Sequence, residues 1–195
     1  EVFPMDIQPV TKASQKSVEL PFNDTYLEYQ WNLFNDGSIH QEALAGADVG
    51  VKDAWRLCAG DPSVVVAVFD LGINHIHEDL RDALWVNEGE TRGNGKDDDG
   101  NGFIDDYNGF NFFRYKTLED DTIKPSDGIN YTKGSGHGTH VAGIIGAVNN
   151  NGKGVSSIAG GTGNKDGVRL MSCQIFYGDN GAKGTDQEAA TGFIY

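Results

Sequence analysis

Basic residues are scarce in this sequence, and their scarcity excludes two classes of partner. The 195 residues contain 15 Lys and Arg against 29 Asp and Glu, so the formal net charge is −14. Binding to nucleic acid or to an anionic membrane surface requires a basic face that neutralises phosphates. We therefore expect no nucleic-acid partner. No apolar run approaches the roughly 20 residues that a membrane-spanning helix needs, so we expect no membrane span.

Cysteine is also scarce. Cys58 and Cys173 lie far apart in the sequence and belong to no CxxC or zinc-type pattern. This spacing favours two separate thiols, leaves one disulfide as the alternative, and does not decide the redox compartment. The chain opens with Glu1-Val2-Phe3, and no signal peptide is visible. A signal peptide removed before this numbering begins would leave such a start.

The apolar pattern predicts alternating strands and helices. Residues 64–69 and 168–176 are apolar runs typical of central strands that are buried on both faces of a parallel sheet. Helical spacing covers 51–58 and 137–148, and Thr185-Asp-Gln-Glu188 is a capping box that opens a third helix. Residues 87–136 are polar, glycine-rich and acidic, which indicates a long loop. This order predicts an α/β fold with a mostly parallel sheet and helices on both faces.

Two residues stand where catalytic side chains are placed. Asp70 directly follows the first strand, at the edge of the sheet where open α/β proteins build their sites. His137 opens the second helix. A histidine that acts as a base needs an acceptor on its other ring nitrogen, and a buried Asp serves this purpose best. Because an Asp after a strand is also a common helix N-cap, the pair alone leaves both roles open.

The segments around these residues resemble the signatures of subtilisin-like serine proteases, the subtilases. The run Asp70-Leu-Gly-Ile-Asn-His-Ile-His-Glu-Asp79-Leu resembles the family's catalytic-Asp segment, with Leu71 where Thr or Ser is usual. The run Gly136-His137-Gly-Thr-His-Val-Ala-Gly matches the catalytic-His segment fully. The order Asp, His, then Ser is that of subtilisin. The resemblance covers about 23–195 and implies an incomplete, N-terminal portion of the subtilisin-like three-layer α/β fold, with 1–22 as an N-terminal extension or pro-segment remnant.

The resemblance also implies what these residues do. His137 would be the general base, and Asp70 would orient its ring. Gly184, Thr185 and Asp186 match the edge segment that binds extended peptide substrates, although Gly is more usual than Asp at the last position. The implied protein is a secreted or cell-envelope serine endopeptidase, and its partners would be peptide or protein substrates.

The nucleophilic serine of such a triad is missing. The sequence contains neither a Gly-Thr-Ser-Met-Ala-like motif nor a GxSxG motif, and Ser135 lies too close to His137 in sequence to serve. We therefore expect 23–195 to be the N-terminal portion of a catalytic domain, inactive alone, whose partner is the remaining C-terminal part with the Ser. The alternative is a non-catalytic subtilase-like or calcium-stabilised binding module. A Gly-Thr-Ser motif downstream would decide between the two.

Acidic residues crowd one stretch of the loop insertion at about 87–130. In Asp97-Asp-Asp-Gly-Asn-Gly-Phe-Ile-Asp-Asp106, five candidate calcium ligands follow the spacing of an EF-hand loop: Asp97, Asp99, Asn101, the Phe103 carbonyl and Asp105. Asn108 replaces the final Glu of that loop, and no EF-hand helices flank it. This pattern predicts a calcium site between the two catalytic motifs. A solvated acidic loop is the alternative.

A second calcium site is implied by the resemblance alone. Many subtilases share a calcium ion between an Asp just after the catalytic-Asp segment and an Asn-rich loop after the His helix. Asp79 and Asn150 match those positions, and one extra residue in this loop lets Asn151 take the place of Asn150. The alternative is that Asn149-Asn-Asn-Gly152 only ends the helix.

Overall fold

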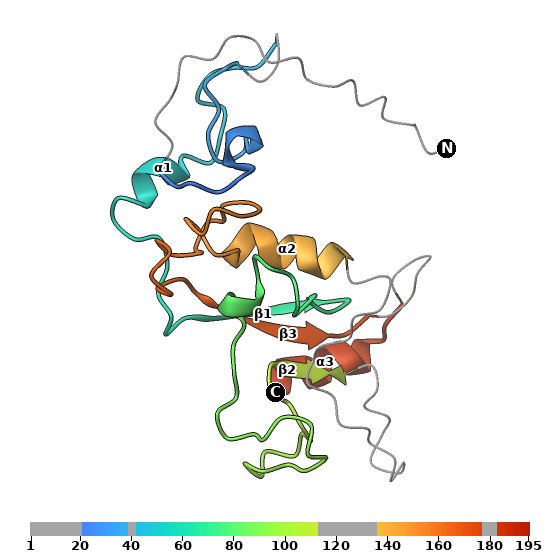
Figure 1. Cartoon of the computed structure of the whole chain (residues 1–195). Helices are drawn as coiled ribbons and strands as arrows, with labels where there is room; N and C mark the ends of the chain where they lie inside the picture. Colours follow the sequence, from blue (N-terminus) through green and yellow to red (C-terminus); the bar gives the residue numbers. More distant parts are fainter. Residues whose placement is uncertain (1–20, 39–41, 113–135, 177–182) are drawn as a thin grey trace.

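A computed structural model describes residues 21–38, 42–112, 136–176 and 183–195. In chain order the elements are η1 (Leu27–Tyr29), α1 (Val51–Ala54), β1 (Val65–Asp70), η2 (Arg81–Ala83), β2 (Gly109–Asn111), α2 (Gly136–Gly146), β3 (Arg169–Gln174) and α3 (Asp186–Ile194) (Figure 1). Ser135 and the second half of the predicted insertion, 113–130, lie outside the described residues. No helix within the described ranges is long and apolar enough to cross a membrane.

The three strands form a parallel sheet in the order β1-β3-β2. The register aligns Asp70 with Gln174 and Gln174 with Asn111, so the strands end together at one edge of the sheet. Parallel neighbours require crossover connections, and α2 lies in the crossover that joins β1 to β3. The predicted α/β fold with a parallel sheet is therefore confirmed.

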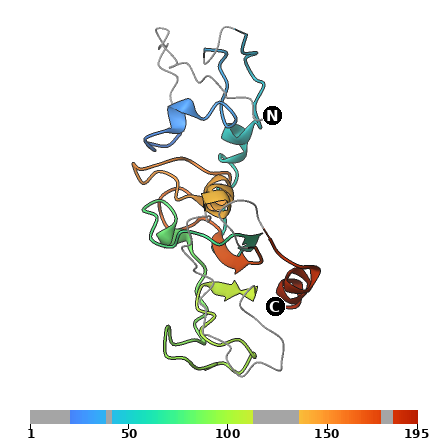
Figure 2. The ribbon, with the colours of Figure 1, turned by 90° about the vertical axis from the view of Figure 1, so that its right-hand side faces the viewer.

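The two faces of the sheet carry different helices. Alternate strand residues point to opposite faces. Val68 and Leu170 belong to a buried cluster with Ala142 of α2, whereas Phe110 and Cys173 belong to a second cluster that Ala189 of α3 joins. The two views accordingly show α2 and α3 on different sides of the sheet (Figures 1 and 2). A catalytic edge between these two helices can be approached from both sides.

Strand β1 differs from the prediction of burial on both faces. Val65 is 41% exposed, and Ala67 on the same face is also exposed. The reason is that α3 covers only the end of this face, where the Phe69 and Phe193 rings stack with centroids 4.8 Å apart. The outer edge of β1 pairs with no other strand among the described residues.

Two further details differ from the sequence predictions. The helix predicted for 51–58 ends at Ala54, and Leu57, which its apolar pattern placed on a buried face, is 91% exposed. The short strand β2 lies inside the stretch predicted as loop. It forms because Gly109, with φ at +116°, lets the chain pass so close to β3 that an added Cβ would overlap the Ser172 carbonyl.

The N-terminal segment docks on the loop that follows α2. Gln30 and Ser156 form a reciprocal pair, in which Gln30 Nε2 donates to the Ser156 carbonyl at 2.8 Å and Ser156 N–H donates to Gln30 Oε1 at 2.7 Å. Trp55 Nε1 donates to the Ile158 carbonyl at 2.9 Å. Because both partners lie just after α2, the segment is held along that helix.

Both cysteines are free thiols, with Cys58 exposed and Cys173 buried. Burial raises the pKa of the Cys173 thiol to about 12, so this thiol is protonated and shielded. We expect one thiol per native chain to react with Ellman's reagent at pH 8, and the second to react only after unfolding. A Cys58→Ser variant should lose the fast reaction. Two equally fast thiols in the native chain would contradict the burial of Cys173.

Candidate active site

Asp70 is the last residue of β1 and is held in place from two directions. The residue is 8% exposed. Its Oδ1 accepts the Leu71 backbone N–H at 2.7 Å, and its Oδ2 lies 2.7 Å from His137 Nδ1. The carboxylate therefore has one oxygen fixed by the backbone and the other directed at the imidazole. The sequence prediction that these two residues meet is matched by this geometry.

His137 reaches Asp70 because α2 begins very close to the end of β1. A Cβ added to Gly138 would lie 2.4 Å from the Gly72 carbonyl and 3.0 Å from Asp70 Cβ, so only glycine fits there. Thr139 Oγ1 accepts the Asn74 N–H at 2.9 Å, which ties the loop after β1 to the same helix. The small residues that the sequence places in this helix thus serve close packing beside the pair.

The burial of the pair is unequal. The Asp70 side chain is 11% exposed, whereas the His137 side chain is 73% exposed. With Nδ1 directed at the carboxylate, Nε2 is the ring nitrogen left to exchange a proton with a reacting group. A neutral imidazole held in this tautomer, with an anion behind it, is the arrangement of a general base.

The predicted substrate segment lies against the end of β3. A Cβ added to Gly184 would lie 2.6 Å from the Ile175 carbonyl, so the chain passes directly over the residues that follow β3. Ile175 N–H in turn donates to the Asp70 carbonyl at 3.0 Å. Gly184, Thr185 and Asp186 are all exposed, and α3 begins at Asp186 as the capping box predicts. The segment is therefore exposed near the edge of the sheet that holds Asp70.

The acidic loop does not gather its carboxylates as an EF-hand would. The Asp97 carboxylate accepts N–H groups from Gly100 and Gly102, at 2.7 and 2.8 Å. The Asp105 carboxylate accepts the N–H groups of Asn94 and Gly95 at 3.0 and 2.9 Å. Asn101 Oδ1 accepts the Phe103 N–H at 2.8 Å, and the Phe103 ring packs edge-on against Phe110 and Tyr195. Backbone amides therefore occupy the oxygens that the spacing assigned to a metal.

A different set of acids comes together in the same loop. Glu90, Asp99 and Asp106 each offer one oxygen, and these oxygens lie within 4.8 Å of one another. Glu90 Oε1 accepts N–H groups from Asp98 and Asp99, but Glu90 Oε2 is buried and has no hydrogen-bond partner in the described part of the chain. Three acids around an unsatisfied carboxylate oxygen suit a hard cation such as calcium.

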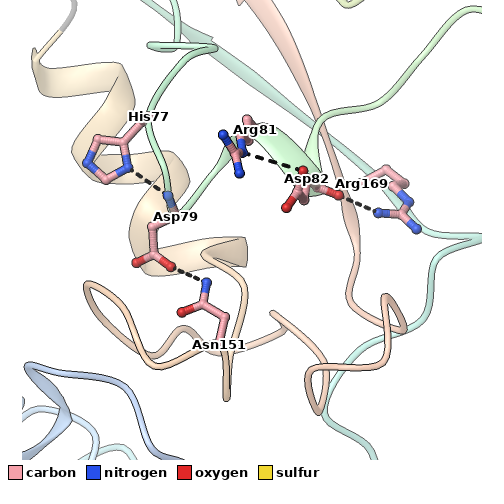
Figure 3. A network of polar contacts seen from close by, with 6 residues as sticks. All are labelled: His77, Asp79, Arg81, Asp82, Asn151 and Arg169. Carbon is pink, nitrogen blue, oxygen red and sulfur yellow. Dashed lines mark hydrogen bonds and ion pairs between the residues drawn. The ribbon is translucent and has the colours of Figure 1, made fainter.

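The loop after α2 brings Asn151, not Asn150, to Asp79 (Figure 3). Asn151 Nδ2 donates to Asp79 Oδ1 at 2.7 Å, and the Val155 N–H donates to Oδ2 at 2.9 Å. Asn150 has φ at +57°, and its side-chain amide donates to the Thr162 carbonyl. The extra residue in the loop thus turns Asn150 away. In the part of Figure 3 away from this loop, Arg81 pairs with Asp82, whose carbonyl accepts from Arg169.

A second buried acid lies in this region. Asp24 is 6% exposed and accepts the backbone N–H groups of Asn150 and Asn151 at 2.9 and 3.0 Å. Burial raises the pKa of the Asp79 carboxyl, and the charge of Asp24 adds to the effect, while hydrogen bonds from Val155 and Asn151 oppose it. No Lys or Arg among the described residues forms an ion pair with either acid. Two buried carboxylates around one Asn-rich loop are compatible with a cation.

Three of these acids were missed by the sequence reasoning. Glu90 precedes the EF-hand-like spacing, Asp106 falls one position after its last predicted ligand, and Asp24 lies in the N-terminal segment. Only the crowding of acids in 87–106 pointed to the first two. For Asp24, no local pattern marks a residue whose partners are more than 120 positions away.

Comparisons with known proteins agree with this geometry. The Subtilase family matches residues 61–195. Subtilisin-like protease 1 of Plasmodium vivax is 37% identical over 140 residues, which cover 71% of this chain and 19% of that protein. Kexin of Saccharomyces cerevisiae is 36% identical over 81 residues, covering 40% of this chain and 9% of that protein.

Solved structures show the same fold. A crystal structure of a serine protease of Aeromonas sobria matches 96% of this chain and 26% of its own, with a TM-score of 0.53 and 21% identity. A protease structure from Pseudoalteromonas arctica matches 90% of this chain and 44% of its own, with a TM-score of 0.50 and 24% identity. The chain spans about a fifth of the length of the first curated relative, and over more than half of its own length it belongs to the subtilase family.

Proposed function

We propose that the chain is the N-terminal part of a serine endopeptidase, in which Asp70 and His137 are two members of an Asp-His-Ser triad. The contact of 2.7 Å between Asp70 Oδ2 and His137 Nδ1 carries this proposal. His137 Nε2 takes the proton of a serine hydroxyl as that oxygen attacks the peptide carbonyl, and then gives the proton to the departing amine. Asp70 keeps the ring in the required tautomer and stabilises the imidazolium.

The partner of this chain, in the same proposal, is the polypeptide that carries the serine. The open edge of β1 and the 41% exposure of Val65 support a further strand and an apolar cover at this place. The limited coverage of the relatives, 19% of the Plasmodium vivax protein, supports a longer catalytic domain. Substrates are extended peptides or proteins, bound by backbone pairing to Gly184, Thr185 and Asp186.

A fluorophosphonate probe tests this division of the triad, because it reacts only with an activated serine. We expect no labelling of the 195 residues alone, and labelling of a protein extended beyond Tyr195 that includes the serine motif. Labelling of the isolated chain would contradict the proposal. Absence of labelling in the extended protein would favour a non-catalytic subtilase-like module.

We further propose that calcium stabilises the chain at two places. Glu90, Asp99 and Asp106 hold one ion, and the buried Oε2 of Glu90 that lacks a partner supports this. Asp24 and Asp79, with the Asn151 loop, hold another. Bound calcium offsets the repulsion between carboxylates and takes no part in the chemistry. Calcium affinities of about 10⁻⁴–10⁻³ M, as in extracellular modules, fit a secreted or cell-envelope protein.

Removing calcium is therefore expected to lower thermal stability. At calcium concentrations of about 100 times Kd, one site contributes about 2.7 kcal/mol. For a protein of this size this corresponds to a fall in Tm of about 5–10 °C on chelation. Scanning calorimetry with calcium or with EDTA measures it. Glu90→Gln should reduce the shift, and Glu88→Gln, an exposed acid nearby, should not. Equal Tm values with and without the chelator would contradict both sites.

A further inference from the structure

An open cavity of about 570 Å³ lies between α2 and the N-terminal segment. One wall is a single face of α2, formed by residues at helical spacing that include Gly136, His140 and Ile144. The other wall contains Tyr26 and Tyr29. Both tyrosines are about half exposed, and Ile144 is 46% exposed, so the cavity is accessible from outside the described chain.

The lining of the cavity is suited to apolar side chains. Leu80, Ile144 and Val155 contribute aliphatic surface between the two tyrosine rings. The glycines at 136 and 143 leave room along the helix, because a Cβ added to either would meet no atom within 4 Å. The Asp79 carboxylate in the lining already accepts hydrogen bonds from Asn151 and Val155, so it is not available to bind a cationic side chain.

The cavity is continuous with the proposed catalytic pair. Gly136, at its near end, directly precedes His137, and the cavity extends from there along α2. In the proposed function His137 returns its proton to the leaving amine, so the peptide on the amine side of the cut bond lies next to this histidine. The segment Gly184–Asp186, proposed to bind the acyl side, leads into α3 on the opposite face of the sheet. The amine side of the substrate is thereby directed along α2.

We propose that this cavity binds an apolar side chain of the substrate on the C-terminal side of the cut bond. The inference rests on the proposed proteolytic function and adds to it a preference on the leaving-group side. An extended peptide advances about 3.3 Å per residue, and the helix rises 1.5 Å per residue. His140 and Ile144 are thus about 6 Å apart along the helix, or about two substrate residues. The second to fourth residues after the cut bond fall within this range.

Two peptide substrates that differ only at the third residue after the cut bond, Phe in one and Gly in the other, test the cavity. The protein is the extended protease that includes the serine motif. We expect kcat/KM for the Phe peptide to exceed that for the Gly peptide by about tenfold, which is typical of a hydrophobic pocket that gains an apolar group. Ile144→Gln should reduce this ratio to about twofold. Ile158→Gln, an exposed isoleucine outside the cavity lining, is the matched control and should keep the tenfold ratio.

Two further measurements separate this inference from the proposed function. A nitroanilide with the same acyl side, which has no residue to place in the cavity, shows whether the triad works. Calorimetric titration with the amine-side peptide alone needs no turnover, and we expect the Phe peptide to bind more tightly than the Gly peptide. Tighter Phe binding without cleavage of any substrate would support the cavity and contradict the protease. Cleavage of all substrates with equal rates and equal affinities would overturn the cavity assignment and leave the protease intact.

Discussion

Replacing His137 by glutamine is expected to lower kcat of the extended protease by about 10⁶-fold, the loss found when the histidine of such a triad is removed. Glutamine has no group that accepts a proton from a serine hydroxyl near neutral pH. The side chain is 73% exposed, so its loss leaves no buried cavity. The fold and KM should therefore change little while the chemical step is lost.

Stopped assays with a nitroanilide substrate measure this effect, and the rate of fluorophosphonate labelling should fall in parallel because both reactions need the activated serine. Scanning calorimetry on the same protein shows whether the fold is retained. A loss of kcat below about tenfold, with the fold intact, would remove His137 from the role of general base. Such a loss is what a residue that only packs at the surface would give.

The larger elements of the fold could be predicted because their signals are local. The strand predicted at 168–176 is β3 at Arg169–Gln174, and the helix predicted at 137–148 is α2 at Gly136–Gly146. Strand β2 could not be predicted, because three residues carry no periodicity and their pairing with β3 depends on the close approach that Gly109 allows. The exposure of one face of β1 was equally unpredictable, since an apolar run does not say what covers it.

The candidate site divides in the same way. Asp70 and His137 are 67 positions apart, yet each lies in a local motif, so their contact could be predicted. The acidic loop was assigned by counting along the chain, but the structure orders it through Asn87, whose side-chain amide donates to both Asp99 and Asp106. These bonds join positions 12 and 19 residues apart, and a spacing rule for one short loop does not contain them.

Asp70→Asn is expected to lower kcat by about 10⁴-fold at neutral pH, although it changes only one atom of the side chain. Asp70 is 8% exposed and lies behind the histidine, so it does not touch substrate and KM should stay the same. The loss arises from the tautomer of His137. A nitroanilide assay measures kcat and KM separately. Asp82→Asn, at an exposed residue outside the site, is the control and should leave both unchanged.

The surroundings of Asp70 decide which way the new amide turns. The Leu71 N–H lies 2.7 Å from Oδ1 and can only donate, so it selects the amide oxygen of the variant. The amide NH₂ is then left facing His137 Nδ1, where Oδ2 stood at 2.7 Å. Because that group also donates, Nδ1 must accept, and the ring proton moves to Nε2, which is then unable to take a proton from serine. Nitrogen NMR of His137 should show the neutral ring protonated at Nδ1 in the native protein and at Nε2 in the variant, and an unchanged tautomer would contradict this account of the Asp70 carboxylate.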